Sequence, residues 1–360
     1  MSHLAQTDIA IIGAGPIGLS AIFACGHLGM RCHVIEALSD VGGQCTALYP
    51  EKPIYDIPGF PSIAAADLIA RLVAQGRPFA PHFHLGQQAV KLTRAGDALS
   101  VEISDGSTIA ARAVIIAAGG GAFGPNRPPL AGIESLEGTS VHYWVKDAAT
   151  FTGMRIVIAG GGDSAVDWAI ALSQYARSVT LVHRRERFRC APASLQKLDE
   201  LRRSGRIALK VPYQLAALKA ESGKLEAIEI NHVDGRHEQI EAEHLLACFG
   251  ISSNLGPLRD FGIALSGERI LVDPFTMETS ERAVFAVGDV ARYSGKQQLI
   301  VTGFAEAVTA ARTAYDRVFP DSPFHFQHST DRSAPHLNLE AHKVDTELMT
   351  VARTAASIET

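Results

Sequence analysis

Two glycine-rich turns stand far apart in this chain, and each follows directly on an apolar strand. The residues that define them are Gly13, Gly15 and Gly18 in the first turn and Gly160, Gly162 and Ser164 in the second. A strand, a tight glycine turn and a helix N-terminus form a cradle for pyrophosphate, because backbone N–H groups and the helix dipole face the anion. Each turn therefore predicts a site for a dinucleotide.

The strands that follow the two turns end in opposite charges. Glu36 closes the strand after the first turn, whereas the strand after the second runs into a basic segment at residues 183–189. A carboxylate accepts hydrogen bonds from ribose hydroxyls and repels a 2′-phosphate, whereas the fork of arginine matches phosphate. We therefore expect a bare ribose at the first turn. At the second we expect NADPH, with its 2′-phosphate against the arginines of this basic segment, which include Arg184, Arg185 and Arg189. A chain that binds two different dinucleotides usually passes electrons between them.

A third motif supports a flavin at the first turn. Residues 283–287 form a short apolar stretch that ends in Gly288-Asp289, ahead of a predicted helix at residues 303–318. An aspartate there accepts hydrogen bonds from polyol hydroxyls, and the helix N-terminus faces the pyrimidine end of the ring. The simpler alternative is a helix N-cap aspartate. The position of the motif, after a complete second domain, favours a flavin domain that is split by an inserted nicotinamide domain.

The predicted fold class is α/β, with two Rossmann-like three-layer dinucleotide-binding domains, the NADPH domain being inserted in the FAD domain. The FAD domain is expected to take residues 1–118 and 251–330, and the NADPH domain residues 119–250. Residues 331–360 are interpreted as a C-terminal tail with at most one short helix.

The composition of the chain argues against several classes of function. The chain has 360 residues, 47% of them hydrophobic and 20% charged, and a formal net charge of −5, which argues against nucleic-acid binding. Residues 9–30 lack Asp, Glu, Lys and Arg, but their glycines and Pro16 indicate a buried strand and helix rather than a membrane span. We therefore expect a soluble, cytoplasmic protein.

The spacing of the cysteines excludes the commonest task of such a fold. The chain has Cys25, Cys32, Cys45, Cys190 and Cys248, with neither a C-x-x-C nor a C-x-x-x-x-C pair. A flavoenzyme that reduces disulfides needs two exchanging thiols, and the spacing fits neither a zinc site nor an iron–sulfur cluster. Metal binding is not expected. Cys45 is interpreted as a packing residue rather than a redox group.

Further motifs point to a family. They are Gly42-Gly43-Gln44, Tyr49-Pro50-Glu51-Lys52, the run from Gly160 to Ala169, His183-Arg184-Arg185 and His328-Ser329-Thr330. On these motifs the chain resembles the thioredoxin-reductase-like ferredoxin–NADP⁺ reductases, homodimeric bacterial flavoenzymes without the redox dithiol. The resemblance covers most of residues 5–330. The chain departs from the family by continuing for thirty residues after Thr330.

The resemblance implies roles for individual residues. Glu36 would hold the adenosine ribose of FAD, and Tyr49 would stack on one face of the isoalloxazine. The other face would be covered by His328 of the partner subunit. The further residues implied to contact FAD are Gln44, Val90, Phe123, Asp289 and Thr330. No acid–base residue is expected, so Tyr49 and His328 are the residues implied at the reacting ring.

The reaction implied is hydride transfer from NADPH to flavin N5, followed by single-electron transfer to ferredoxin or flavodoxin. Two alternatives stay open. One is an NAD(P)H oxidase or a disulfide reductase without the usual dithiol. The other is a non-enzymatic sensor that binds flavin and NADP, which the tail at residues 331–360 keeps open because tails often recruit partners.

Overall fold

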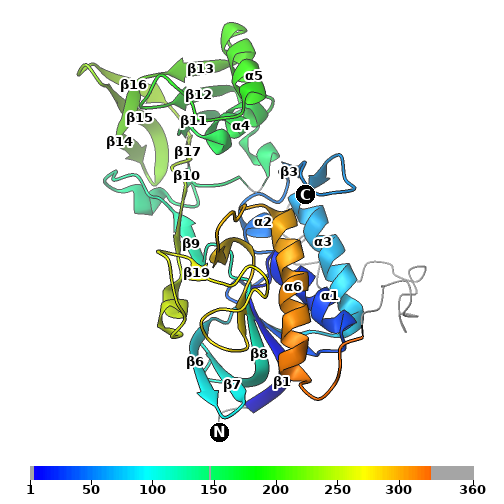
Figure 1. Cartoon of the computed structure of the whole chain (residues 1–360). Coiled ribbons are helices and arrows are strands. Elements are labelled where there is room, and N and C mark those ends of the chain that lie inside the picture. The colour runs from blue at the N-terminus through cyan, green and yellow to red at the C-terminus, as the bar shows by residue number, and fades with distance from the viewer. Residues whose placement is uncertain (1–3, 146, 326–360) are drawn as a thin grey trace, which may run out of the picture. The chain divides into compact units, whose positions relative to one another are not determined.

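The structure is a computed structural model that describes residues 4–145 and 147–325. The chain divides into two compact units. The first takes the residues up to Ala122 and again from Ser253, and the second is Phe123–Ser252. In Figure 1 the second unit is green, whereas the first combines the blue and cyan start of the chain with its yellow and orange end. The chain therefore leaves the first unit, completes the second and returns, within a few residues of the predicted crossing points.

The first unit is built on a seven-stranded sheet in the order β5-β2-β1-β8-β7-β6, with β20 also paired to β8. Its strands are β1 (Leu4–Ile12), β2 (Cys32–Glu36), β5 (His82–Leu85), β6 (Ala89–Ala95), β7 (Ala98–Ile103), β8 (Thr108–Ile116) and β20 (Val284–Ala286). β1, β2, β5, β8 and β20 are mutually parallel, whereas β7 runs antiparallel to β8 on one side and to β6 on the other. β20 lies opposite β8 with Phe285 against Ile115, both fully buried. The returning segment thus completes the core of the first unit.

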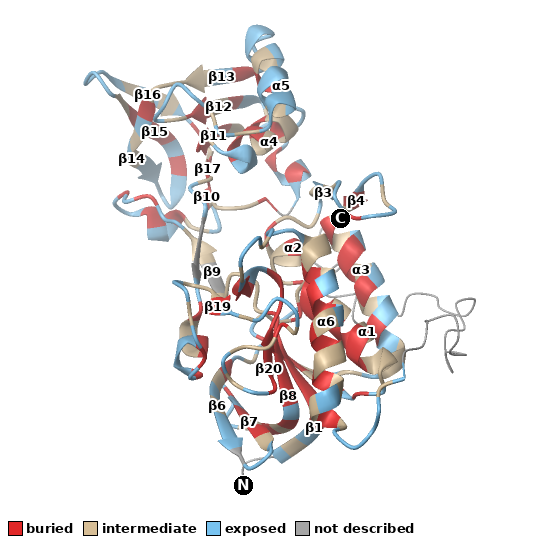
Figure 2. Cartoon of the chain, viewed as in Figure 1, coloured by how far each residue is buried: buried red, intermediate tan, exposed pale blue. Residues whose placement is uncertain are grey.

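Three long helices belong to this unit; α1 and α6 contact strands of the sheet, and α1 contacts both α3 and α6. They are α1 (Pro16–His27), α3 (Ala65–Gly76) and α6 (Ile300–Val318). α6 buries Ala307, Ala310, Ala311 and Ala314, a spacing that places small side chains on one face. Figure 2 shows the buried residues along the strands and on the inner faces of these helices. α1 begins at Pro16, because proline suits the first turn of a helix.

Shorter elements complete the first unit. They are α2 (Gln44–Ala47), β3 (Pro53–Ile54), β4 (Ile63–Ala64), β19 (Ile270–Leu271), β21 (Ala291–Arg292) and the 3₁₀ turns η1 (Arg77–Phe79), η4 (Gly256–Asp260) and η5 (Gly288–Val290). The two connecting segments, β9 (Ala122–Pro125) and β18 (Ile251–Asn254), pair with each other.

The second unit has a five-stranded parallel sheet in the order β10-β17-β11-β12-β13. Its strands are β10 (Val141–His142), β11 (Arg155–Ala159), β12 (Ser178–Val182), β13 (Ile207–Lys210) and β17 (His244–Ala247). The remaining elements are α4 (Asp163–Leu172), α5 (Pro192–Arg203), η2 (Ile133–Leu136), η3 (Ala148–Phe151) and an antiparallel sheet of β14 (Tyr213–Glu221), β15 (Lys224–His232) and β16 (His237–Glu241).

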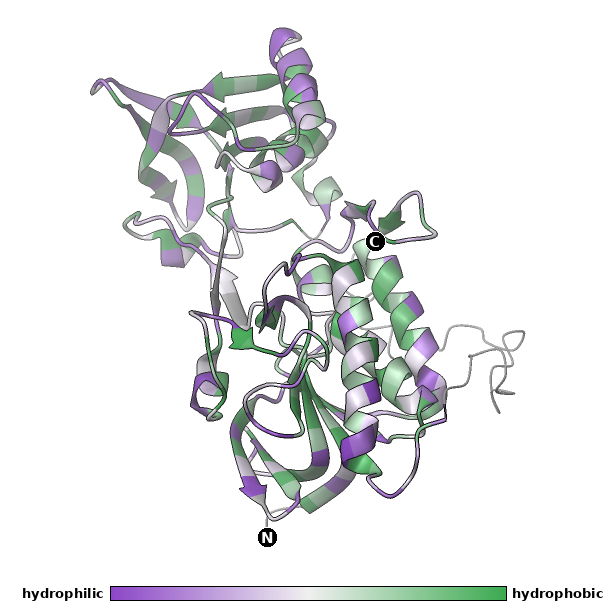
Figure 3. Cartoon of the chain, viewed as in Figure 1, coloured by the Kyte–Doolittle hydropathy of each residue, from purple (hydrophilic) through white to green (hydrophobic). Residues whose placement is uncertain are grey.

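Alternate residues of β11 face two different cores, which makes the second unit three-layered. Val157 and Ala159 pack with residues of β15, whereas Ile156 and Ile158 pack with residues of α4. This alternation follows from the two-residue period of a strand. α5 covers the outside, and Figure 3 shows it mostly in hydrophilic colours, in keeping with Leu198 as its one buried residue.

The uncharged run at residues 9–30 forms the end of β1, the first glycine turn, α1 and the turn after it. Within the described ranges, no helix is both long enough and apolar enough to span a membrane.

Candidate dinucleotide sites

The first glycine turn is packed tightly on two sides and open on the third. Gly13 has φ +105°, and a Cβ on it would lie 2.5 Å from the carbonyl oxygen of Ala117. A Cβ on Gly18 would overlap the carbonyl oxygen of Gly13. By contrast, nothing lies within 4 Å of the Cβ position on Gly15, at the start of α1. The turn therefore leaves space for a ligand beside the N-terminus of a helix.

Glu36 lies beside this turn as a buried carboxylate. One oxygen accepts a hydrogen bond from the Ala14 N–H at 2.7 Å, and the other accepts one from the Leu38 N–H at 2.9 Å. Burial raises the pKa of Glu36, and these two hydrogen bonds oppose the rise. Each carboxylate oxygen has a second lone pair, so Glu36 can also accept from ligand hydroxyls.

The segment around Gln44 packs onto the same turn. The Gly42 N–H donates to the carbonyl oxygen of Ala14 at 2.8 Å, and a Cβ on Gly43 would lie 3.2 Å from the Cα of Gly15. Gln44 follows as the first residue of α2. The fold thus brings Gln44 to the glycine turn.

Tyr49 is half-buried against the core of the first unit, and its hydroxyl lies near the thiol of Cys45. Burial raises the pKa of Tyr49, and the nearby Asp289 carboxylate adds to the rise. Burial also raises the pKa of Cys45 to about 11, so this group is a thiol near neutral pH.

The other predicted flavin contacts are spread more widely. Val90 is half-buried at an irregularity of the β6–β7 ladder. Three residues earlier, the Gln87 N–H donates to the carbonyl oxygen of Glu36 at 2.9 Å. The side chain of Phe123 is not described, and His328 and Thr330 lie outside the described residues.

The second turn repeats the packing of the first. A Cβ on Gly160 would lie 2.6 Å from the carbonyl oxygen of Cys248, and Ala165 stands where the first turn has Gly18. The atom nearest to the Cβ position on Gly162 is 3.9 Å away. Ser164 is exposed in the first turn of α4. Here too the middle of the turn is open at a helix N-terminus.

The basic segment folds back onto this second turn. The Arg189 N–H donates to the carbonyl oxygen of Gly161 at 2.7 Å, and the Ala191 N–H donates to the Asp163 carboxylate at 2.9 Å. The ring of His183 lies where a Cβ on Gly161 would be, and burial lowers the pKa of His183. Asp163 therefore holds the basic segment in place, a role that the sequence alone did not indicate.

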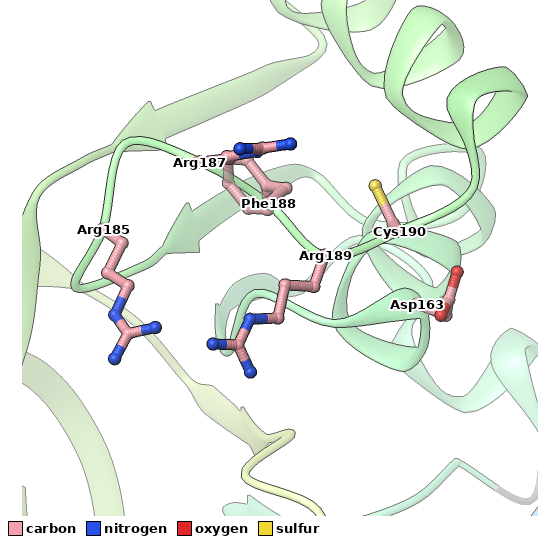
Figure 4. Close-up of a pocket in the computed structure, with 6 residues that line it drawn as sticks. All are labelled: Asp163, Arg185, Arg187, Phe188, Arg189 and Cys190. Carbon is pink, nitrogen blue, oxygen red and sulfur yellow. The ribbon is translucent and has the colours of Figure 1, made fainter.

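A pocket of about 670 Å³ opens between the basic segment and the start of α4. Its lining residues are Asp163, Arg185, Arg187, Phe188, Arg189 and Cys190. Figure 4 shows the guanidinium groups of Arg185 and Arg189 on the same side of the segment, with that of Arg187 turned away from them. Arg184 is exposed and is not among the lining residues. The arrangement suits a phosphate held by two guanidinium groups.

The fold also brings together two thiols whose spacing in the sequence does not indicate a pair. Cys25 of α1 and Cys32 of β2 are free thiols and both are buried, and the Cys32 thiol donates to the carbonyl oxygen of Met30. Contact with the Cys32 thiol and burial raise the pKa of Cys25 well above its ordinary value. A buried thiol with a raised pKa is a poor nucleophile.

Two of the most similar solved structures share the fold of this chain. The thioredoxin reductase of Lactococcus lactis in its FR conformation superposes with a TM-score of 0.74 at 24% identity, covering 87% of this chain and 99% of that one. The thioredoxin reductase of T. acidophilum gives 0.73 at 24% identity, covering 86% and 98%. These likenesses establish a two-domain dinucleotide-binding fold. The profile of the pyridine nucleotide-disulphide oxidoreductases matches residues 7–314.

Similar sequences identify the family to which the chain belongs within this class. A protein of Rhodospirillum rubrum named Ferredoxin--NADP reductase is 52% identical over 334 residues, which cover 92% of this chain and 97% of that one. A protein of Paramagnetospirillum magneticum with the same name is 51% identical, covering 92% and 98%. The chain thus belongs to the pyridine nucleotide-disulphide oxidoreductases and, within them, to the ferredoxin–NADP reductase family. The predicted fold class and family resemblance are confirmed.

Proposed function

We propose that this chain is an FAD-dependent oxidoreductase that transfers electrons between NADPH and ferredoxin, or flavodoxin. The observation that carries the proposal is the pair of open glycine turns with opposite charges beside them, a buried carboxylate at the first and convergent arginines at the second. The family supports it, because its members in two other bacteria carry the name Ferredoxin--NADP reductase.

The first unit is proposed to bind FAD, at residues that fit the group. The space at Gly15 would take the pyrophosphate at the N-terminus of α1, and Glu36 would accept from the adenosine ribose. Gln44, Val90 and Asp289 would follow along the cofactor. Phe123 and Tyr49 would line the ring.

The second unit is proposed to bind NADPH. The space at Gly162 would take its pyrophosphate, with Ser164 beside it, and Arg185 and Arg189 would hold the 2′-phosphate. Arg184 would add to the positive charge from outside the pocket. The chemistry that the two cofactors supply is hydride transfer to flavin N5 and then single-electron transfer. The protein residues orient the cofactors and carry no proton, so acid–base groups are not required.

We further propose a cytoplasmic homodimer, in which His328 of the partner subunit and Thr330 of the partner subunit cover the second flavin face. The family resemblance and the His-Ser-Thr motif support this arrangement. A solution mass of twice 38.4 kDa is expected. A monomeric mass at micromolar concentration would reject it.

The function is tested by anaerobic stopped-flow. The purified protein is mixed with NADPH and then, in separate runs, with an oxidised ferredoxin or an oxidised flavodoxin, while the absorbance of the enzyme flavin and of the carrier is recorded. We expect rapid flavin bleaching followed by ferredoxin reduction. Bleaching followed only by flavodoxin reduction would favour flavodoxin as the carrier. If NADPH leaves the flavin oxidised, the proposal fails.

The disulfide-reductase alternative is not favoured, because the buried Cys25–Cys32 pair is poorly suited to exchange with a substrate. Full NADPH-to-ferredoxin activity in a Cys25→Ser, Cys32→Ser variant would exclude it. Steady NADPH-dependent turnover of ferricyanide would likewise exclude a non-enzymatic sensor.

A further inference from the structure

A buried carboxylate on α6 binds three donors from one segment of the first unit. Glu306 is 4% exposed. One of its oxygens accepts from the Gly288 N–H at 2.7 Å, and the other accepts from the Tyr293 hydroxyl at 2.7 Å and from the Lys296 ammonium. The Lys296 side chain is only 2% exposed. The segment 288–296 is therefore held at its beginning and at its end by one side chain.

The network reaches the turn that carries Asp289. Gly288 has φ +75°, and a Cβ on it would lie 3.1 Å from Ile17, in the first turn of α1. A Cβ on Gly303 of α6 would lie 2.5 Å from the same isoleucine. α6, the Gly288 turn and the start of α1 are thus in close packing. A hydrogen bond from Gly288 to Glu306 fixes the backbone directly before Asp289.

Asp289 is free to meet a ligand. Its backbone carbonyl accepts from Arg269, whose guanidinium also lies 3.5 Å from the carbonyl oxygen of Gly119. Its carboxylate is exposed and accepts no hydrogen bond from the residues that the structure describes. The backbone on either side is anchored while the carboxylate is available, which is the arrangement of a preorganised ligand contact.

We infer that Glu306 is a positioning residue for the flavin: through Gly288, Tyr293 and Lys296 it sets the turn that presents the Asp289 carboxylate. The inference rests on the proposed function, in which Asp289 contacts FAD. Glu306 does not itself contact the cofactor in this account. Burial and the hydrogen bond to Glu306 raise the pKa of Tyr293 to about 12, so its hydroxyl remains a donor.

The competing explanation is that Glu306 only neutralises a buried lysine. Two double variants separate these roles. Glu306→Leu with Lys296→Met replaces the ion pair by apolar side chains, a change that is often tolerated, but leaves the Gly288 N–H without an acceptor. Glu306→Gln with Lys296→Met also removes both charges but retains an amide oxygen for Gly288.

The measurement is the dissociation constant of FAD, from fluorescence titration of apoprotein prepared from holoenzyme, with the flavin absorption spectrum and urea unfolding alongside. We expect the leucine variant to bind FAD at least about tenfold more weakly and the glutamine variant to stay within about threefold of wild type. Equal FAD affinity in wild type and the leucine variant would overturn the inference.

Two further variants provide a second test of the inference and a control. Glu306→Asp keeps the charge pair but withdraws the carboxylate from Gly288, so an intermediate loss of FAD affinity is expected even if the leucine variant does not fold. Wild-type affinity in Glu306→Asp would overturn the inference.

The matched control is Glu278→Leu with Arg317→Met, because the Glu278 carboxylate also accepts from a backbone N–H, that of Ala283, and from a cation on α6. Its FAD affinity should be unchanged. A wild-type chain that binds no FAD would instead refute the proposed function.

Discussion

The two glycine turns have the same backbone design but different means of holding a ligand. At the first, the charged group is a buried carboxylate, Glu36, that is itself bonded to the turn. At the second, the charged groups are exposed arginines on a separate segment, which backbone hydrogen bonds and Asp163 tie to the turn. The charged group of the first site therefore lies in the core, whereas the charged groups of the second site lie at the surface.

This difference has a physical consequence. A buried carboxylate that is fixed by N–H donors needs little reorganisation when a ligand arrives, and dissolved salt screens it weakly. Exposed guanidinium groups attract phosphate over a longer range, but salt weakens that attraction. The first site suits a cofactor that stays bound, and the second suits one that exchanges in each turnover.

The largest expected effect is on the folding of the first turn. Gly18→Ala places a methyl group against the carbonyl oxygen of Gly13 and should lower the free energy of unfolding by about 3 kcal/mol. The reverse change at the matching position, Ala165→Gly, should cost about 1 kcal/mol. Urea unfolding measures both. Equal effects would mean that the turns are not packed differently at these positions.

The next effect is the loss of one cofactor at a time. Gly15→Ala and Gly162→Ala meet no atom within 3.5 Å, so the fold should be retained while the methyl fills the space for pyrophosphate. Gly15→Ala should weaken FAD at least tenfold and Gly162→Ala should weaken NADPH by a similar factor, because each loses charge-assisted hydrogen bonds worth about 1.5–3 kcal/mol. Fluorescence titration distinguishes them, and loss of the other cofactor would contradict the site assignments.

A smaller, selective effect is expected at the pocket of the second unit. Arg185→Ala with Arg189→Ala should raise the KM for NADPH about 100-fold while changing that for NADH little, because only NADPH has the 2′-phosphate. Arg187→Ala is the control, since its guanidinium points away from the other two. Arg184→Ala should raise the KM for NADPH by less than the double variant does and by more than Arg187→Ala does. Steady-state kinetics at low and high salt measure these changes, and equal losses for both nucleotides would refute the phosphate role.

The smallest effect concerns pH, and it compares the units directly. Each contains a histidine pair with ring nitrogens 3.0 Å apart, His33 with His84 and His142 with His244. Burial, with the neighbouring imidazoles, lowers the pKa of His33 and of His142 from 6.5 to about 4. Between pH 4 and 6.5 the unfolded chain thus binds more protons, so stability is lost as the pH falls through this range.

Replacing His142 by glutamine should therefore flatten the pH dependence of unfolding for the second unit alone. Urea unfolding at pH 5 and pH 7, followed by a probe in each unit, measures this. An unchanged slope in the second unit would mean that His142 is not held neutral by the fold.

Much of the candidate site could be predicted from the sequence, because its parts are local. Gly13, Gly15 and Gly18 lie in one turn, and Glu36 ends the next strand, so a βαβ unit necessarily places them together. The same holds for Gly160, Gly162 and the basic segment. The returning motif at Gly288-Asp289 was recognisable by its position along the chain.

Other features could not be predicted, because they depend on side chains that meet across the fold. Residues 184–189 contain four arginines, and only the path of the backbone directs Arg185 and Arg189 to one side. Cys25 and Cys32 have no recognisable redox spacing, yet the packing of α1 on β2 joins them.

The sequence by itself determined the class of protein, the two dinucleotide turns and the opposite charges beside them, since these depend on spacing along short segments. Only the tertiary structure decided how the charged groups are held. Glu306 acts on Gly288 from the next helix along the chain, and Asp163, at the start of α4, acts on the backbone at the end of the basic segment. Such contacts arise from the packing of whole elements, which a local pattern of residues does not specify.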